Sequence, residues 1–197
     1  MNTYQVVVFV HVLAAVILMG GSIGAAPSIA SMVRHATTIE DIRRALHHAR
    51  RLAPISPVAA VALLASGLYL AEAGSWWRWG WVWVSVTLWV MNLVLATGVV
   101  RPSLAHLTKL VEVATVDTIS ADIDAARRWR GRAVAEDLIL AGDLAVLFMM
   151  IAKPTGYVTP VALVVITALA VTGSQRLLES RTPRLQTAPA AAEMARR

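Results

Sequence analysis

Several apolar stretches of about 20 residues constrain the fold of this chain more than any other feature of its sequence. An α-helix needs about 20 apolar residues to cross roughly 30 Å of hydrocarbon. Because lipid offers no partners to backbone N–H and C=O groups, a spanning segment must satisfy them internally. The sequence therefore predicts an all-α, multi-pass transmembrane helical bundle. Its five spans are expected at about residues 4–32, 52–73, 79–100, 133–153 and 158–175.

The composition agrees with a membrane protein and excludes several other classes. Of the 197 residues, 57% are apolar and only 15% are charged. No cysteine is present, so disulfides, thiolate metal sites and thiol chemistry are excluded. The net charge of +6 does not indicate a nucleic-acid partner, because the basic residues flank the expected spans instead of forming one patch. The expected partner is the lipid bilayer, and the oligomeric state, including a homo-oligomer, stays open.

The distribution of basic residues predicts the orientation in the membrane. Sixteen of the eighteen Lys and Arg residues fall on one side, and only Arg78 and Lys153 fall on the other. The positive-inside rule makes the basic side cytoplasmic, which places the N-terminus outside and the C-terminus inside. Five Trp residues between positions 76 and 83 then lie at the outer interface, where we expect them to form an aromatic belt.

The chain is expected to form one bundle domain, residues 1–180, followed by a disordered cytoplasmic tail, residues 181–197. The small residues 22–26 resemble a cleavage site, but the basic segment of a secretion signal is missing, so we expect the first helix to be retained. Small residues in the first span should allow close helix approach in the core. They are Gly20, Gly21, Gly24, Ala25 and Ala26.

Helices are also expected on the cytoplasmic side. Thr37 and Glu40 match a capping box that would open a helix with one apolar face, and this helix should lie on the membrane surface and continue toward the second span. Residues 104–115 and 121–129 predict two further helical pieces outside the membrane.

Asp143 lies near the middle of the fourth expected span, where an ionisable side chain is by default a hypothesis of function. A rise of about 1.5 Å per residue places His11 and Asn92 at a similar depth, and His11 is its expected partner. Glu136 lies two turns earlier on the same face. Two interpretations stay open. One is a proton relay or the polar lining of a cofactor pocket. The other is interhelical hydrogen bonding, with Asp143 bonded to Asn92 or His11, or protonated.

His11 is the candidate ligand for a metal or cofactor. A neutral imidazole is the usual protein ligand of haem iron and a common ligand of copper. The alternative is a hydrogen-bonded packing residue. Met149 and Met150 lie near it in depth or somewhat further out and carry thioethers that bind haem or copper, although we favour core packing for both. The other histidines are expected to be solvated on the cytoplasmic side: His35, His47, His48 and His106.

Two sequence patterns together resemble a known group. Residues 9–11 (Phe-Val-His) are followed by a Gly pair at 20–21 and by Pro27, and residues 149–154 (Met-Met-Ile-Ala-Lys-Pro) end the fourth span. With residues 57–67, these resemble the CopD-like and HemJ-like group of small bacterial membrane proteins. The closest resemblance is to its uncharacterised branch, a domain of unknown function. The resemblance implies the cytoplasmic membrane of a bacterium.

In the HemJ-like branch the resemblance implies protoporphyrinogen oxidation, with haem b bound in a four-helix bundle. His11 matches the histidine of the first helix and would be an axial ligand, while Lys153 matches a terminal lysine that would lie near propionates or substrate carboxylates. The chain departs from that pattern, since His35 lies too far along to match the second histidine and no lysine opens the third span. The CopD-like branch implies copper uptake.

Three functions are therefore compatible with the sequence. The first is a redox protein that binds haem b through His11, with porphyrin or haem as partner. The second is a carrier of metal ions or protons that uses Asp143 and Glu136. The third is a non-catalytic scaffold whose cytoplasmic helices bind a partner. Whether the protein is an enzyme stays open at this point.

Overall fold

The computed structural model describes residues 2–154, 161–162, 164–166 and 169, and within them every regular element is helical. The predicted all-α class is thus confirmed. The expected fifth span, residues 158–175, lies mostly outside the described residues, and the expected tail, 181–197, lies wholly outside them.

Three long helical segments are apolar enough to span a membrane, and each is built from shorter elements. The first segment comprises α1 (Thr3–Gly20), the π-helical η1 (Gly21–Ala25) and α2 (Ala26–His35). The second comprises α3 (Ile39–Leu52) and α4 (Ile55–Ala73). The third comprises α5 (Gly80–Leu95), the π-helical η3 (Ala96–Val100) and α6 (Arg101–Glu112). A helix of 33 residues is about 50 Å long, which exceeds about 30 Å of hydrocarbon. Each segment therefore extends beyond the apolar layer.

The fourth expected span corresponds to α8 (Arg130–Ala152), which follows the short α7 (Ala121–Arg127). This helix carries Glu136, Asp137 and Asp143 and is not among the three candidate spans in the described residues. Its passage through the membrane, like the count of five spans, stays a prediction.

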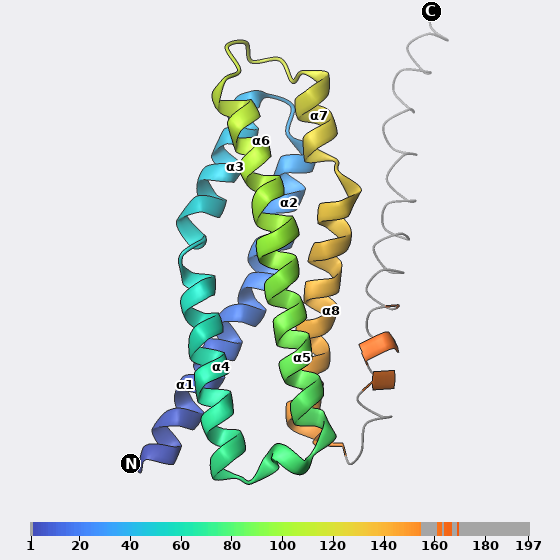
Figure 1. Cartoon of the computed structure of the whole chain (residues 1–197). Coiled ribbons are helices and arrows are strands. Elements are labelled where there is room, and N and C mark those ends of the chain that lie inside the picture. Colours follow the sequence, from blue (N-terminus) through green and yellow to red (C-terminus); the bar gives the residue numbers. More distant parts are fainter. Residues whose placement is uncertain (1, 155–160, 163, 167–168, 170–197) are drawn as a thin grey trace, which may run out of the picture.

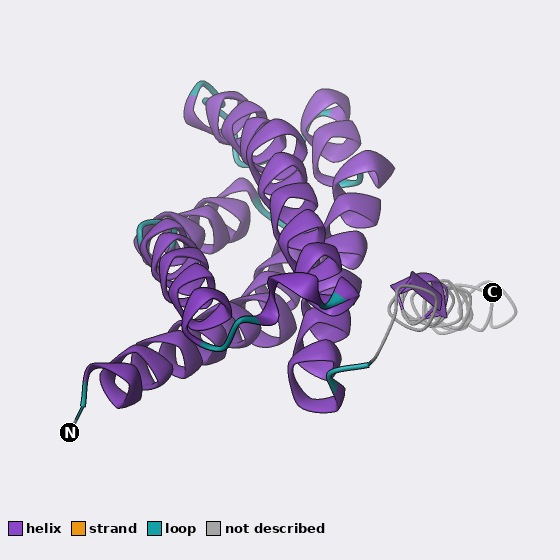
Figure 2. Ribbon diagram, turned by 60° about the horizontal axis from the view of Figure 1, so that its bottom comes forward, coloured by secondary structure: helices purple, strands orange, loops and turns teal. Residues whose placement is uncertain are grey.

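The helices run up and down the long axis of the molecule (Figure 1). The most extensive packing is between α1 and α4 and between α5 and α8, and Figure 2 shows these two pairs side by side. Both π-helical segments, η1 and η3, pack against α8. As a result α8 is the element that joins the first helix to the third.

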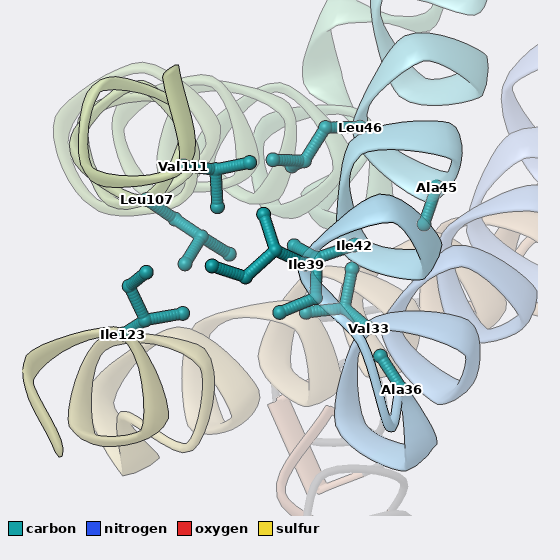
Figure 3. Packing of buried hydrophobic residues seen from close by; sticks show 9 residues of the cluster. All are labelled: Val33, Ala36, Ile39, Ile42, Ala45, Leu46, Leu107, Val111 and Ile123. Atoms are coloured by element: carbon teal, nitrogen blue, oxygen red, sulfur yellow. The ribbon is translucent and has the colours of Figure 1, made fainter. Parts of the chain in front are cut away.

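The projecting helix ends form a compact cap, which consists of the end of α2 together with α3, α6 and α7 (Figure 1). Its apolar core is buried, and Figure 3 shows the side chains of all of these elements converging. Ile42 and Leu107 have no exposed surface. Full burial of such a side chain contributes roughly 1.5–3 kcal/mol. The prediction that the helix after residue 38 lies on the membrane surface is wrong, because its apolar face is buried in this core. The prediction that it continues toward the second span is confirmed, because α3 and α4 form one long helical segment.

The start of α3 also differs from the prediction by one residue. Thr38 is the N-cap: its hydroxyl accepts from the Asp41 amide at 3.2 Å, and the Asp41 carboxylate accepts from the Thr38 amide at 3.3 Å. The expected Thr37–Glu40 box is therefore wrong. The register follows from the core, since it buries Ile39 and leaves Glu40 outside to pair with Arg43 at 2.6 Å.

The expected role of the glycines in the first span is also wrong among the described residues. A methyl group added at Gly20, Gly21 or Gly24 would meet nothing within 4 Å. Close approaches occur at Gly67 and Gly142 instead, both opposite polar side chains of another helix.

The Trp-rich connection between α4 and α5, which includes the short 3₁₀ helix η2 (Trp76–Arg78), lies at the end opposite the cap (Figure 1). Trp81 is buried in a cluster with Ala71 and Met149, and the ring of Trp76 lies beside it at 5.8 Å between centroids, tilted by 50°. The aromatic-belt prediction is therefore incomplete, because Trp81 is packed inside the bundle at the end opposite the cap and does not lie at an interface.

Candidate functional site

Asp143 is the centre of a polar cluster in which three helical elements meet. Its Oδ2 atom accepts a hydrogen bond from the Ser22 hydroxyl of η1 at 2.5 Å, and its Oδ1 atom accepts from the Asn92 amide of α5 at 2.9 Å. The expected pairing of Asp143 with Asn92 is present. No described residue forms an ion pair with Asp143, so its two partners are both neutral.

The Ser22 hydroxyl fits either protonation state of the Asp143 carboxyl group. Its oxygen lies 3.1 Å from the Leu18 carbonyl oxygen as well as 2.5 Å from Asp143. When the carboxyl group is ionised, the hydroxyl donates to it. When the carboxyl group is protonated, it can donate to the serine oxygen, whose own hydrogen then turns to Leu18. The same heavy-atom positions therefore satisfy Asp143 with and without its proton.

The side-chain amide of Asn92 forms two hydrogen bonds to α8. Its Nδ2 atom donates to Asp143 and also to the Ile139 carbonyl at 3.3 Å, so both hydrogens of the amide have acceptors. A methyl group added at Gly142 would lie 2.7 Å from Asn92 Oδ1. The glycine is therefore required for the amide to reach the carboxyl group.

Glu136 lies on α8 two turns toward the cap from Asp143, among charged side chains. Its Oε1 atom is 3.7 Å from Nε of Arg132, and Arg34 and Asp137 also act on it electrostatically. Arg132 is only 4% exposed, and its Nη2 atom donates to the Arg127 carbonyl at 2.9 Å. Glu136 thus connects the interior of the bundle with the base of the cap.

His11 does not meet Asp143, and the prediction that they are partners is wrong. His11 Nδ1 lies 3.0 Å from the Ser66 hydroxyl of α4. On the first helix, the residue that reaches Asp143 is Ser22, which is eleven positions, or about 16 Å, further along the axis. The first long helix therefore contacts Asp143 at Ser22 and not at His11. The depth of His11 in the membrane, taken alone, predicted the wrong partner.

The Ser66 hydroxyl orients the ring of His11. Its oxygen lies 3.0 Å from Nδ1 of His11, 2.5 Å from the Ala62 carbonyl oxygen and 3.1 Å from the Leu63 carbonyl oxygen. When the hydroxyl donates to one of these carbonyls, its oxygen can accept from a protonated Nδ1. A methyl group added at Gly67 would lie 3.1 Å from the ring, which shows that the imidazole is packed closely against α4.

Lys153 ends α8 in the left-handed conformation, at φ 42°. Its ammonium lies 4.5 Å from the ring centroid of Trp76, a cation–π contact. Met149, one turn earlier, is fully buried beside Trp81. The described contacts therefore place His11 against α4 and Lys153 against the Trp-rich connection, and none joins the two.

No described residues form a group of three or more His, Asp or Glu side chains able to hold a metal ion. His11 is accordingly a single candidate ligand and not part of a chelating set. His47, His48 and His106 are exposed. His35 is paired within its own helix, since its ring nitrogen lies 2.9 Å from the Ser31 carbonyl.

The sequence interpretation missed both serines of these sites. Ser22 and Ser66 are small and occur among Gly and Ala residues, so they look like packing positions. The available signal was their hydroxyl group, because Ser side chains form hydrogen bonds across helices in membranes. Only the rotation of the helices decides which of several serines faces a carboxyl or an imidazole group.

Comparison with known proteins agrees with a membrane location. Residues 5–154 match the model of the family described as "Predicted integral membrane protein (DUF2269)". The chain belongs to the DUF2269 family. No curated protein and no solved structure matches the chain. The DUF2269 match covers α1 to the end of α8 and thus includes both the Asp143 cluster and His11. It supports an uncharacterised membrane family and does not extend to the CopD-like or HemJ-like branches.

Proposed function

We propose that this protein carries protons through the membrane, and that Asp143 is the group that takes up and releases the proton. One observation carries the proposal: Ser22 and Asn92 satisfy the carboxyl group in both protonation states without any movement of heavy atoms. A group that cycles a proton needs this property, because an unsatisfied polar group in hydrocarbon costs several kcal/mol.

Among the described residues Asp143 has no cationic partner, which also supports proton transfer over a purely structural role. Two helices could be joined equally well by an amide in place of the carboxyl group, since Asn offers the same hydrogen-bonding reach. A carboxyl group at this depth is costly and adds only the ability to titrate. Protonation of Asp143 and hydrogen bonding between the helices are therefore distinct roles, and a substitution that removes only the first can test them separately.

The proposed arrangement in the membrane has five spans, with the N-terminus outside and the cap in the cytoplasm of a bacterium. It is supported by the arginines of the cap and by the Trp residues at the opposite end, which match the positive-inside rule and the aromatic preference of interfaces. Protons would then reach Asp143 from the cytoplasmic side through the base of the cap.

Proton flux into liposomes loaded with a pH-sensitive dye tests the proposal. Asp143→Asn keeps the hydrogen-bonded shape but cannot titrate, so we expect at least a tenfold loss of flux with an unchanged midpoint of thermal unfolding. Glu112→Gln is the control, because Glu112 pairs with Arg50 on the exposed surface of the cap. Wild-type protein that conducts no protons, or a variant with wild-type flux, would refute the proposal.

A second candidate function is favoured by the contact between His11 and Ser66. The hydroxyl group meets Nδ1 and orients the ring, as the second hydrogen bond of a metal-ligating histidine does. We propose His11 as the axial ligand of haem b in a redox protein of the kind that the HemJ-like resemblance implies. Haem would supply one-electron chemistry when bound. Lys153 is the proposed partner for porphyrin carboxylates. On binding them, its ammonium group would leave its cation–π contact with Trp76.

The absorption spectrum of protein produced with ample haem tests this second function. We expect a Soret band that His11→Ala abolishes and that Ser66→Ala shifts or weakens, since the imidazole loses the hydrogen-bond partner that orients it. Ser28→Ala is the matched control, because the Ser28 hydroxyl donates only to the Gly24 carbonyl of its own helix. A colourless wild-type protein would exclude the haem proposal while leaving the proton proposal intact.

A further inference from the structure

Ionisable and polar groups continue from Asp143 toward the cap along one face of α8. Glu136 lies seven residues before Asp143, which is close to two full turns and about 10 Å along the helix axis. Arg132 lies one further turn away, within 3.7 Å of Glu136. The series ends at the Arg127 carbonyl in the cap, which accepts from Arg132.

Polar atoms also lie between Asp143 and Glu136 along α8. Asn92 links Asp143 to the Ile139 carbonyl, one turn from Glu136. The Oδ1 atom of Asn92 is buried and has no hydrogen-bond partner among the described residues. Two carboxyl groups about 10 Å apart can exchange a proton only through intervening water, and these polar atoms offer water the partners it needs.

Arg132 interacts with the Glu136 carboxylate without forming a short hydrogen bond to it. The guanidinium group is almost fully buried, and its Nε atom lies at 3.7 Å from the carboxylate, beyond the distance of a strong hydrogen bond. Its Nη1 atom is buried with no described partner. This group can therefore donate to one further partner, such as a water molecule.

We propose that Glu136 is the relay that passes protons between Asp143 and the cap side of the membrane, and that Arg132 is the positioning residue for its carboxylate. This inference rests on the proposed function. Ionised Glu136 takes up a proton from bulk water on the cap side, and this proton then moves along hydrogen-bonded water to an ionised carboxyl oxygen of Asp143. The reverse path returns it. Arg132 stays charged throughout. The charged groups that act on Glu136 are Arg132, Arg34 and Asp137.

Time-resolved infrared spectroscopy after a pH jump tests the relay in detergent-solubilised full-length protein. The band of the protonated Asp143 carboxyl group is identified by its loss in Asp143→Asn. We expect Glu136→Gln to slow the appearance of this band at least tenfold and Glu136→Asp to restore part of the rate. Glu112→Gln makes the same chemical change in the cap and should leave the rate unchanged.

Arg132→Lys tests the positioning role. It keeps the positive charge but loses the guanidinium contacts, so the dependence of the Asp143 protonation rate on pH should shift while the helical content stays constant. An unchanged pH profile would overturn the role of Arg132.

The outcomes separate this inference from the proposed function. If Glu136→Gln slows protonation but the wild-type protein moves no protons across liposomes, the relay stands and the transport function fails. If Asp143 is protonated at the wild-type rate in Glu136→Gln, the relay is overturned and transport stands. If Asp143 never changes protonation, both are overturned.

Discussion

The Ser22 hydroxyl oxygen lies 2.5 Å from Oδ2 of Asp143, although 121 positions separate the two residues in the sequence. The contact joins a π-helical segment of the first long helix to the middle of α8. π-Helical turns inside longer helices occur frequently at functional sites. Here the segment contributes a hydroxyl group that can act as donor or acceptor toward the Asp143 carboxyl group in the interior of the bundle.

Removal of that hydroxyl should affect stability modestly and proton exchange strongly. Ser22→Ala leaves one oxygen of Asp143 without its partner, which costs about 1 kcal/mol in a membrane helix bundle. Thermal unfolding in detergent measures this loss, and the infrared band of Asp143 measures the change in protonation. Ser28→Ala should change neither quantity, and an equal effect of both substitutions would contradict the assigned role of Ser22.

A methyl group at Gly142 should disrupt the cluster from the opposite side. Gly142→Ala places a carbon atom 2.7 Å from Asn92 Oδ1, so the amide must move away from Asp143. We expect a loss of about 1–3 kcal/mol from overpacking, and reduced proton flux. The matched change Gly20→Ala meets nothing within 4 Å and should be neutral or slightly stabilising, because Ala favours the helix by up to about 1 kcal/mol. Equal unfolding midpoints for the two variants would contradict the close approach.

Arg127 should be the most important cation of the cap. Its Nη1 atom donates to the Ala36 carbonyl at 2.8 Å, and its guanidinium group pairs with Asp124 at 2.6 Å while remaining buried. Arg127→Ala should cost about 2–3 kcal/mol, since it removes charged hydrogen bonds from buried carbonyl groups.

Arg128 provides the control, because it pairs with the same Asp124 but is exposed. Arg128→Ala should cost no more than about 1 kcal/mol. Thermal unfolding in detergent compares the two variants, and equal losses would show that burial of Arg127 does not matter.

The pH dependence of the cap should follow Asp124. Arg128 and then Arg127 donate to this carboxylate and hold the pKa of Asp124 below its usual value of about 3.8. Because the folded-state pKa lies below the unfolded-state pKa, the stabilisation is complete above the unfolded value. It is lost as the pH falls through the folded value.

Comparison of wild-type protein with Asp124→Asn across a pH series measures this effect. The difference between their unfolding midpoints should be constant from neutral pH to roughly pH 5 and should shrink in stronger acid. A difference that grows on acidification would contradict the direction of the shift.

The positions of the membrane helices could be predicted from the sequence because lipid imposes them locally. A run of apolar residues of sufficient length must form a helix, whatever its neighbours are. The expected starts and ends of the second and third spans accordingly lie close to those of α4 and of α5 with η3. The register of α3 was less accessible, since both Thr37 and Thr38 can open a capping box and only the core of the cap selects Thr38.

The sequence by itself determined that the chain is an all-α membrane protein and that Asp143 is its most unusual residue. Tertiary structure decided that Ser22 and Asn92, and not His11, surround this carboxyl group, and that His11 is oriented by Ser66. The physical reason is that apolar length and depth are properties of one helix, whereas the choice of partner depends on how each helix is rotated and tilted against the next. Those angles arise from packing over the whole bundle.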